Sequence, residues 1–437
     1  MNERLVRSAL AAVLFVYVLT IRTYDVATTF LMLGEQTRDW AIALGGITDL
    51  PLVGAPSTAG GRGLGPAYYY LLWLGRVTIG PFMDNLPHVG GITVALLQSI
   101  ADAWLFVALS SRVPWSLALA TCLLIASGPF DIAISSVIWN PPVAAALIKM
   151  SAASALMLDP KGPAWKLAVP AVLAWAAVQT HLSAAFPALA ILGGVALAIR
   201  KLTPIAIMTG AIAVMQIPFA WSILSEPGAP AGPTTAIASI TSGQSFRPFF
   251  GLDTVTGVTG NLFLPMPDSF KFWIPAVVCG AIVVARYRRD PAVIGVSIGG
   301  IAVAAAIFST WTRSYDGYWF LTMTTGLALT FAFTIAALPW RPVVLGIGVV
   351  LIGLFAAWQP ARIEDSKKYF EYPQYGTMVR GSTELIMKAP AVRDIKVGFD
   401  VHPTMNRHFI YTILGGRIDT NALYTAVIQA DGTVELQ

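Results

Sequence analysis

The sequence predicts an α-helical polytopic membrane protein, with about eleven transmembrane helices and a small soluble C-terminal domain. The 437 residues are 56% hydrophobic and only 12% charged, about half the charged share of a soluble domain. Long apolar runs follow one another with short loops between them, and a bilayer-spanning helix needs about 20 such residues. The mean hydropathy of +0.68 agrees with burial of most of the chain in lipid.

The first span is expected at Leu5–Leu19, and we interpret it as a retained helix because no small-residue cleavage site follows it. Further apolar runs have the length and composition of spans. They lie at Val89–Leu109, Trp115–Ser127, Pro142–Leu158, Leu167–Val178, Ser183–Ala198, Pro204–Leu224, Phe272–Ala285, Ala292–Phe308, Tyr318–Leu338 and Val343–Trp358.

Basic residues gather in alternate loops, which is the signal that orients membrane proteins. The loops in question hold Arg4, Arg7, Arg112, Lys161, Lys166, Arg200, Lys201, Arg286, Arg288, Arg289 and Arg341. This pattern predicts a cytoplasmic N-terminus and an extracytoplasmic C-terminus. Counting Pro66–Ile79 as a span would invert every later loop, so we expect it to form a juxtamembrane helix, whose tyrosines and tryptophan suit the interface.

The chain divides into a transmembrane domain at residues 1–358 and a soluble domain at residues 359–437. In the second part, Ile395–Phe399 and Tyr424–Ile428 alternate as strands do. We therefore expect a small α/β domain on the outer face. The net charge of +5 does not indicate a nucleic-acid partner, because the basic residues occur singly or in small groups beside apolar runs.

The first outer loop holds the most informative polar residues. Glu35 and Asp39 lie four residues apart, about one helical turn, and Arg38 lies beside Asp39. Desolvation at the membrane surface would raise the pKa of such a carboxylate and suit it to act as a general base. The simpler alternative is the solvated face of an interfacial helix.

A glycine-rich segment with Arg62 follows in the same loop and leads to Tyr68 and Tyr69. Glycines let the backbone approach a ligand and offer N–H groups to phosphate. The alternative for this segment is a plain turn.

Other outer segments carry candidates with two interpretations each. Asn140, before Pro141, either caps the next span or lines a site. Asp131 is either an exposed interfacial charge or a second acid. His181, near Gln179 at the end of a span, is either a satisfied packing residue or part of a cavity.

The remaining candidates lie in a late outer loop and within a span. Arg313 either clamps a phosphate or pairs with Asp316, and Tyr318 follows in the same loop. Lys149 lies inside a span, where it either extends to the interface or pairs.

In order along the chain, these segments resemble bacterial membrane glycosyltransferases of the GT-C fold, in the group called glycosyltransferase family 39 or ArnT/PMT-like. The family patterns are a Leu-Arg-x-Tyr end of the first span, an acidic pair, Gly-Pro-x-Tyr-Tyr, Ser-Arg-x-x-Trp-Asn-Pro and Gln-x-His. Their counterparts are Ile21–Tyr24, Glu35–Asp39, Gly65–Tyr69, Ser135–Pro141 and Gln179–His181. A tyrosine of a late outer loop in the family is similar to Tyr315 or Tyr318.

Two positions depart from the family pattern. Glu35 stands where the family has a leading aspartate, and Ser136 stands where it has an arginine. Asp25 is a rival catalytic acid, because related families place theirs near the end of the first span.

The resemblance implies a transferase of the bacterial plasma (inner) membrane that moves a hexosyl or pentosyl group from a polyprenyl phosphate. The acceptor would be a hydroxyl of an envelope glycan, lipid or protein on the extracytoplasmic face, and the anomeric centre would invert. Glu35 would act as base, with Asp25 as its rival, and Asp39 would orient the acceptor or pair with Arg38. Substrate would contact Arg38, Arg62, Tyr68, Tyr69, Asn140, His181, Arg313 and Tyr318.

No cofactor is required by the spacing, although a divalent cation held by Glu35, Asp39 and Asp131 stays open. The alternative from another class is a lipid or solute transporter without transferase chemistry. Transporters tend to show internal repeats and ionisable residues in mid-membrane, and no repeat is visible. A scaffold that has lost catalysis is a third reading, which the departures at Glu35 and Ser136 would permit.

Overall fold

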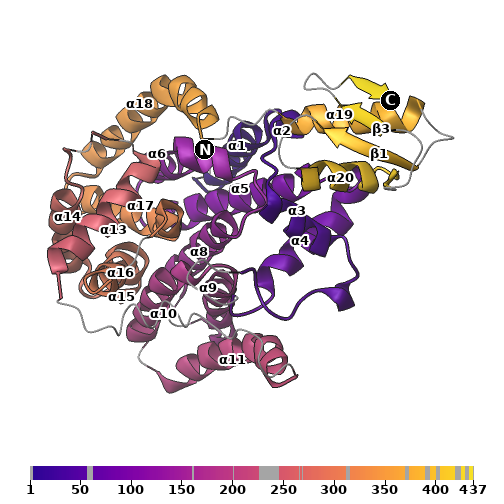
Figure 1. Cartoon of the computed structure of the whole chain (residues 1–437). Coiled ribbons are helices and arrows are strands. Elements are labelled where there is room, and N and C mark those ends of the chain that lie inside the picture. The colour runs from indigo at the N-terminus through magenta and orange to yellow at the C-terminus, as the bar shows by residue number, and fades with distance from the viewer. Residues whose placement is uncertain are drawn as a thin grey trace.

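The computed structural model describes most of the chain, with gaps. The described residues are 3–56, 63–159, 162–199, 201–225, 246–264, 266–267, 269–311, 315–369, 374–388, 394–399, 404–418, 425–428 and 433–436. A bundle of long helices makes up most of the molecule, and a small sheet with two helices lies at one corner (Figure 1).

The expected spans all coincide with apolar helices. Within the described residues, seven segments are long and apolar enough to cross a membrane. They contain α1 (Glu3–Thr23), α5 (His88–Ser110), α10 (Ala185–Ile199), α11 (Leu202–Ser225), α15–α16 (Pro291–Ile294 and Gly300–Phe308, joined by the π-helical η5, Gly295–Gly299), η6–α17 (Gly317–Met323 and Thr324–Ala336) and α18 (Arg341–Lys367). The shorter apolar helices are α6 (Trp115–Ala126) and α14 (Trp273–Tyr287). Two further expected spans form α8 (Asn140–Leu156) and α9 (Ala168–Thr180).

Small residues let these helices approach closely, as in other membrane bundles. The alanine-rich α8 is buried along nearly its whole length between α5 and α9. A Cβ added at Gly295 would lie 2.4 Å from the carbonyl oxygen of Ala190, and one at Gly348 would lie 2.4 Å from the backbone nitrogen of Leu117. Glycine is therefore required where η5 meets α10 and where α18 meets α6.

Short helices cover the end of the bundle at which α1 finishes and α5 begins. They are α2 (Val26–Thr29), α3 (Gly34–Ala43), η1 (Ile47–Asp49), α4 (Ala67–Thr78) and η2 (Gly80–Phe82). We call this the α3 end of the bundle. The segment expected to be a juxtamembrane helix forms α4, which is not among the candidate spans and buries Tyr68 and Tyr69.

The α3 end also holds α7 (Pro129–Ile134), η4 (Leu182–Ala184) and α13 (Pro248–Phe263), while η3 (Ala164–Leu167) precedes α9. The sequence did not predict α13, which lies between the ends of two spans. The backbone N–H of Arg247 donates to the carbonyl of Ser309, just after α16. At its other end, Phe263 packs against Gly128, just after α6.

The C-terminal part forms the expected small α/β domain. It consists of α19 (Gln374–Lys388), α20 (Thr404–Ile413), β1 (Asp394–Phe399), β2 (Arg417–Ile418), β3 (Thr425–Ile428) and β4 (Val434–Leu436). The strand order is β2-β1-β3-β4, in which β1 runs parallel to both neighbours and β4 runs antiparallel to β3.

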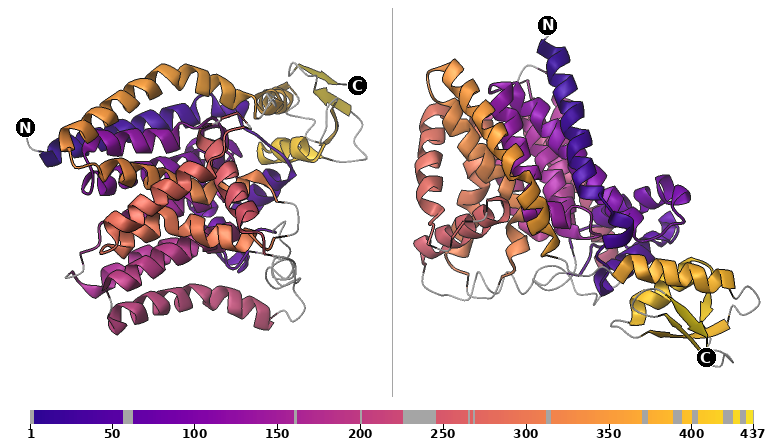
Figure 2. Two further views of the ribbon diagram at one scale, coloured as in Figure 1. Left: turned by 90° about the vertical axis from the view of Figure 1, so that its left-hand side faces the viewer. Right: turned by 90° about the horizontal axis from the view of Figure 1, so that it is seen from above.

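This domain packs against the α3 end (Figure 2). Helix α19 contacts α2, and α20 contacts α3. The hydroxyl of the buried Tyr375 lies 2.8 Å from Nδ1 of His88 and accepts from its backbone N–H at 3.2 Å. The Tyr375 ring also meets Phe30 edge-on, with ring centroids 5.1 Å apart. Aromatic and hydrogen-bonded contacts thus join the domain to the bundle.

Candidate active site

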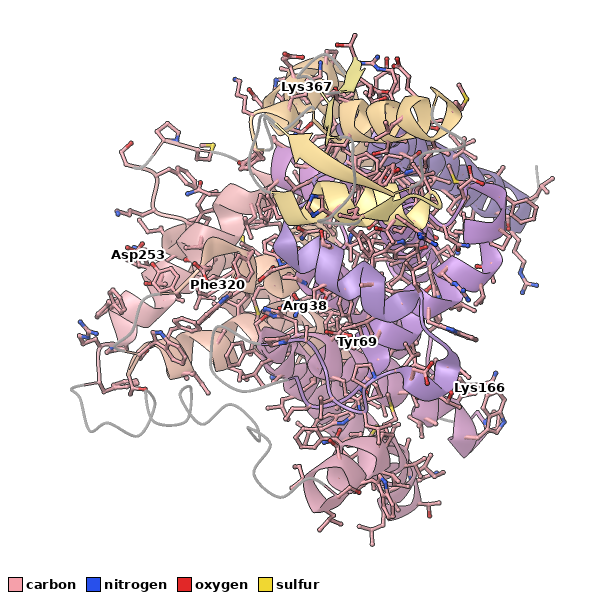
Figure 3. The ribbon with its side chains drawn as sticks, turned by 45° about the vertical axis from the view of Figure 1, so that its right-hand side comes forward. Arg38, Tyr69, Lys166, Asp253, Phe320 and Lys367 are labelled. Atoms are coloured by element: carbon pink, nitrogen blue, oxygen red, sulfur yellow. The ribbon has the colours of Figure 1, made fainter. Side chains whose placement is uncertain are left out.

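Asp39, in the first loop region, accepts hydrogen bonds from Arg38, Tyr68 and Tyr69, and we call this arrangement the Asp39 clamp. Asp39 is 2% exposed. Its Oδ1 accepts from Arg38 Nε at 2.8 Å and from the Tyr69 hydroxyl at 3.2 Å, and its Oδ2 accepts from the Tyr68 hydroxyl at 3.1 Å. Arg38 and Tyr69 lie near each other beneath the C-terminal sheet in Figure 3. Burial raises the pKa of Asp39 above its ordinary 3.8, although the hydrogen bonds from Arg38 and the tyrosines favour the ionised form.

Glu35 has the opposite surroundings. It is exposed in the first turn of α3 and makes no hydrogen bond or ion pair with any other described residue. A carboxylate in a first helical turn is stabilised by the helix dipole. Asp25 is also exposed, at a positive φ of 55°, and its side chain does not cap α2. The interpretation of a solvated helix face therefore fits the position of Glu35 but not that of Asp39.

The turn that carries Glu35 is fixed against the segment before α8. The side-chain amide of Gln36 donates to the carbonyl of Ile138 at 3.1 Å and accepts from the backbone N–H of Leu33 at 3.0 Å. At the other end of α3, the indole of the buried Trp40 donates to the carbonyl of Asn85 at 2.8 Å. These bonds hold α3 rigidly beside the residues that open α8.

An aromatic cluster continues from that segment. The ring centroids of Trp139 and Tyr318 are 4.6 Å apart, and those of His181 and Tyr318 are 6.1 Å apart. The side-chain amide of Asn140 donates to the carbonyl of Thr180 at 3.2 Å, so it joins α8 to α9 and does not cap its own helix. Three predicted site residues, Asn140, His181 and Tyr318, are thereby brought together from three distant parts of the chain.

His181 is neutral in this setting. Its Nδ1 lies 2.8 Å from the Ser183 hydroxyl. Burial lowers the pKa of His181 from 6.5 to about 4. At neutral pH the imidazole is therefore a hydrogen-bonding group and not a cation.

The described glycines of the first loop serve close packing. The N–H of Gly54 donates to the carbonyl of Gly63, and that of Gly63 donates to the carbonyl of Ala55, each at 3.0 Å. A Cβ at Gly65 would lie 2.4 Å from the amide carbon of Gln179. The loop thus lies directly on the end of α9. Arg62 and Arg313, two predicted substrate contacts, lie outside the described residues.

Asp131 is not the exposed interfacial charge that one of the two interpretations of the sequence expected. Asp131 is 5% exposed, and its Oδ2 lies 2.7 Å from a guanidinium nitrogen of Arg22. Arg22 also lies 2.7 Å from Asp102, and Lys149 lies 2.7 Å from Asp102 and 3.9 Å from Asp131. We call Arg22, Asp102, Asp131 and Lys149 the buried ion cluster. Lys149 is thus paired, and the cluster carries two positive and two negative groups.

Sequence reasoning missed Asp102. The sequence did hold a signal for it: Asp102 is an isolated acid in one apolar run and Lys149 is an isolated lysine in another. Each requires a partner inside the membrane, and they could have been paired on that ground. Among the described residues, no three His, Cys, Asp or Glu side chains gather as metal ligands. Asp131 lies in the buried ion cluster and Asp39 in its clamp, so the cation set of Glu35, Asp39 and Asp131 does not form.

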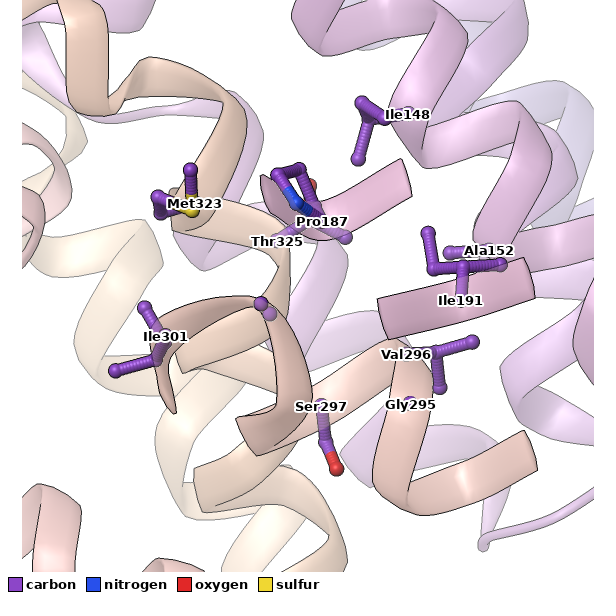
Figure 4. Close-up of a pocket in the computed structure, with 12 residues that line it drawn as sticks. Ile148, Ala152, Pro187, Ile191, Gly295, Val296, Ser297, Ile301, Met323 and Thr325 are labelled. Carbon is purple, nitrogen blue, oxygen red and sulfur yellow. The ribbon is translucent and has the colours of Figure 1, made fainter. Parts of the chain in front are cut away.

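A small apolar cavity of about 10 Å³ lies deeper in the bundle, between α8, α10, η5 and η6–α17 (Figure 4). Ile148, Ile191 and Met323 line it, and the hydroxyl of Ser297 is already bonded to the carbonyl of Val293 at 2.6 Å. No charged side chain lines this cavity, so it is a packing feature separate from the polar groups of the α3 end.

No protein-family model and no curated protein sequence matches the chain. Among solved structures, the chain is similar to ArnT from Cupriavidus metallidurans, both bound to undecaprenyl phosphate and in the apo state. Each alignment has 14% sequence identity and a TM-score of 0.59, and covers 92% of this chain and 84% of that one. This similarity confirms the GT-C-type fold that the sequence motifs suggested.

Proposed function

We propose that the protein is a membrane glycosyltransferase that transfers a sugar from a polyprenyl phosphate to an acceptor hydroxyl at the α3 end of the bundle. The observation that carries this proposal is the bond from Gln36 to Ile138. It ties the turn that bears the unpaired Glu35 to the segment that bears Trp139, which packs on Tyr318. A carboxylate and an aromatic wall on neighbouring elements suit the binding of a sugar. The relative that shares the fold binds undecaprenyl phosphate.

Glu35 is the proposed base. Both oxygens of Asp39 are occupied by Arg38 and the two tyrosines, whereas Glu35 is exposed and unpaired within the described chain. A general base must reach the proton that it removes. Asp39 is then a positioning residue, which fixes Arg38, Tyr68 and Tyr69.

The reaction follows from these roles. Glu35 takes the proton of the acceptor hydroxyl as that oxygen attacks the anomeric carbon. The bond from the anomeric carbon to the phosphate oxygen breaks, and the polyprenyl phosphate leaves with the electron pair. Arg38, whose side chain is 39% exposed, supplies positive charge to the leaving phosphate, and neutral His181 offers a hydrogen bond. Attack opposite the leaving group inverts the anomeric centre.

The rival base is Asp25, and its position supports it less well. It precedes α2, and α2 packs against α19 of the C-terminal domain. Transport remains the alternative from another class. The buried ion cluster is the kind of intramembrane feature that transporters use, but all four of its members are paired with one another.

The test is an assay of transfer in membranes, with a panel of polyprenyl-phosphate-linked hexoses and pentoses as donors. Glu35→Gln should lower the rate by about 10²–10⁴-fold, the range for loss of a general base. Glu364→Gln is the matched control, because Glu364 is an exposed carboxylate that, within the described part of the chain, pairs with Lys367 alone. Full activity of Glu35→Gln together with loss in Asp25→Asn would assign the base to Asp25. Movement of the donors without their consumption, in the wild type, would favour a transporter.

A further inference from the structure

A membrane-facing groove runs between α1, α6 and α18, away from the candidate active site. Its volume is about 540 Å³. Apolar side chains such as Val13, Leu123 and Ile352 line most of it. Helices α1 and α18 lie on the same side of the bundle (Figure 2). Such a surface suits a hydrocarbon chain, but the apolar lining alone does not identify the occupant.

The end of the groove formed by Gln359 and Ile363 adjoins a buried cation, Arg362, which is not itself a lining residue. Arg362 is 6% exposed, and it makes no ion pair with any other residue in the described part of the chain. Its guanidinium donates to the Ser127 hydroxyl at 3.3 Å and to the carbonyl of Phe263. It also lies 5.7 Å from the centroid of Phe355, which lines the groove. A buried charge of this kind requires a counter-charge.

Neighbouring carboxylates do not meet this requirement. Asp131 acts on Arg362 electrostatically, but it already serves Arg22 and Lys149 in the buried ion cluster. The two cations and two anions of that cluster balance one another, so the charge of Arg362 is additional. An anionic group at the head of the groove would neutralise it.

A second polar group identifies the class of ligand. Gln359 lines the groove and is 9% exposed, and its amide nitrogen is buried without a hydrogen-bond partner. It precedes Arg362 by three residues, about 4.5 Å along the helix axis. A glycerophospholipid carries ester carbonyls at about that depth below its phosphate. A polyprenyl phosphate has no carbonyl there, so the free amide N–H favours the diacyl lipid.

We propose that this groove binds one anionic glycerophospholipid of the surrounding bilayer. One acyl chain lies between α1 and α18, an ester carbonyl accepts from Gln359, and the phosphate pairs with Arg362 beside Ser127. The site does not depend on the transferase assignment. It explains a buried unpaired cation and an unsatisfied amide with one ligand.

The test measures lipid retained by the full chain. The protein is reconstituted in nanodiscs of phosphatidylglycerol and phosphatidylcholine, extracted in detergent, washed, and analysed by native mass spectrometry. The wild type should retain about one phosphatidylglycerol per chain. Arg362→Gln should lower this retention by about tenfold, and Gln359→Leu should lower it by a smaller factor. Arg341→Gln, at the exposed opposite end of α18, is the matched control and should retain the lipid.

A variant that leaves Arg362 in place keeps the test decisive if Arg362→Gln fails to fold. Ala356 is exposed and lines the groove, so Ala356→Trp should fill it and expel the lipid. Unchanged retention in Ala356→Trp would overturn the proposal. So would equal retention of phosphatidylcholine and phosphatidylglycerol, or recovery of a polyprenyl phosphate from the same groove when that lipid is added to the nanodiscs.

Discussion

At the scale of single residues, the first-loop carboxylates differ by their surroundings. Glu35 is exposed and unpaired among the described residues, whereas Asp39 is buried and accepts three hydrogen bonds. The sequence identified both, because their spacing and the neighbouring Arg38 are visible in it. It could not divide their roles, since that division depends on Tyr68 and Tyr69, which reach Asp39 from another helix.

Asp39 gives a prediction about pH. Its folded-state pKa is raised above 3.8 by burial, so the folded protein binds this proton more tightly than the unfolded chain. Its contribution to the free energy of unfolding is therefore greatest at low pH and falls as pH rises through the folded-state pKa. The transfer rate should instead rise with pH over the same range, because the hydrogen bonds from Arg38, Tyr68 and Tyr69 need the ionised carboxylate of Asp39.

Thermal unfolding and transfer, each measured from pH 4 upward, check this prediction. Asp39→Asn should remove its part of the pH dependence of stability and lower transfer at every pH. A variant with the wild-type pH profile in both measurements would show that Asp39 does not titrate as described.

At the scale of elements, the buried ion cluster holds α1, α5, α7 and α8 together. Asp131 is the member of the cluster that lies on α7, and the hydroxyl of Ser135 also donates to its carboxylate at 3.3 Å. The segment from Ser135 leads to Trp139 and Asn140. The cluster thus sets the position of the loop that forms one wall of the candidate site, although none of its members belongs to that wall.

Removal of Lys149 should be costly. Lys149→Met leaves Asp102 and Asp131 with only Arg22, and breaking a buried pair costs about 3–5 kcal/mol. The double variant Lys149→Met with Asp102→Leu leaves Arg22 opposite Asp131 at 2.7 Å. It should be more stable than Lys149→Met alone. Unfolding midpoints in detergent measure the difference, and simple addition of the two single effects would contradict the cluster.

The sequence predicts those helices whose position depends only on the burial of apolar residues in lipid. The apolar runs coincide with the helices because each must bury about 20 residues in the bilayer. Helix α13 was not predictable, since its ends are fixed by Ser309 and Gly128 from other spans. The role of Asp102 was missed for the same reason, because its partners lie on α1 and α8, far away in the sequence.

At the scale of the whole molecule, the C-terminal domain and the bundle meet at the α3 end. Tyr375 bonds to His88 at the start of α5, and α20 contacts α3. The domain therefore supports the helix that carries Glu35. The sequence predicted a small α/β domain, but it carried no signal for the surface to which that domain would dock.

The most direct measurement of the proposed function is a cryo-electron microscopy structure of Glu35→Gln with a polyprenyl-phosphate-linked sugar that the wild type consumes. We predict the sugar between α3 and Tyr318, with the side chain of residue 35 within about 3 Å of the acceptor side of the ring. A sugar bound at the opposite end of the bundle, or separated from α3 by the C-terminal domain, would contradict the account.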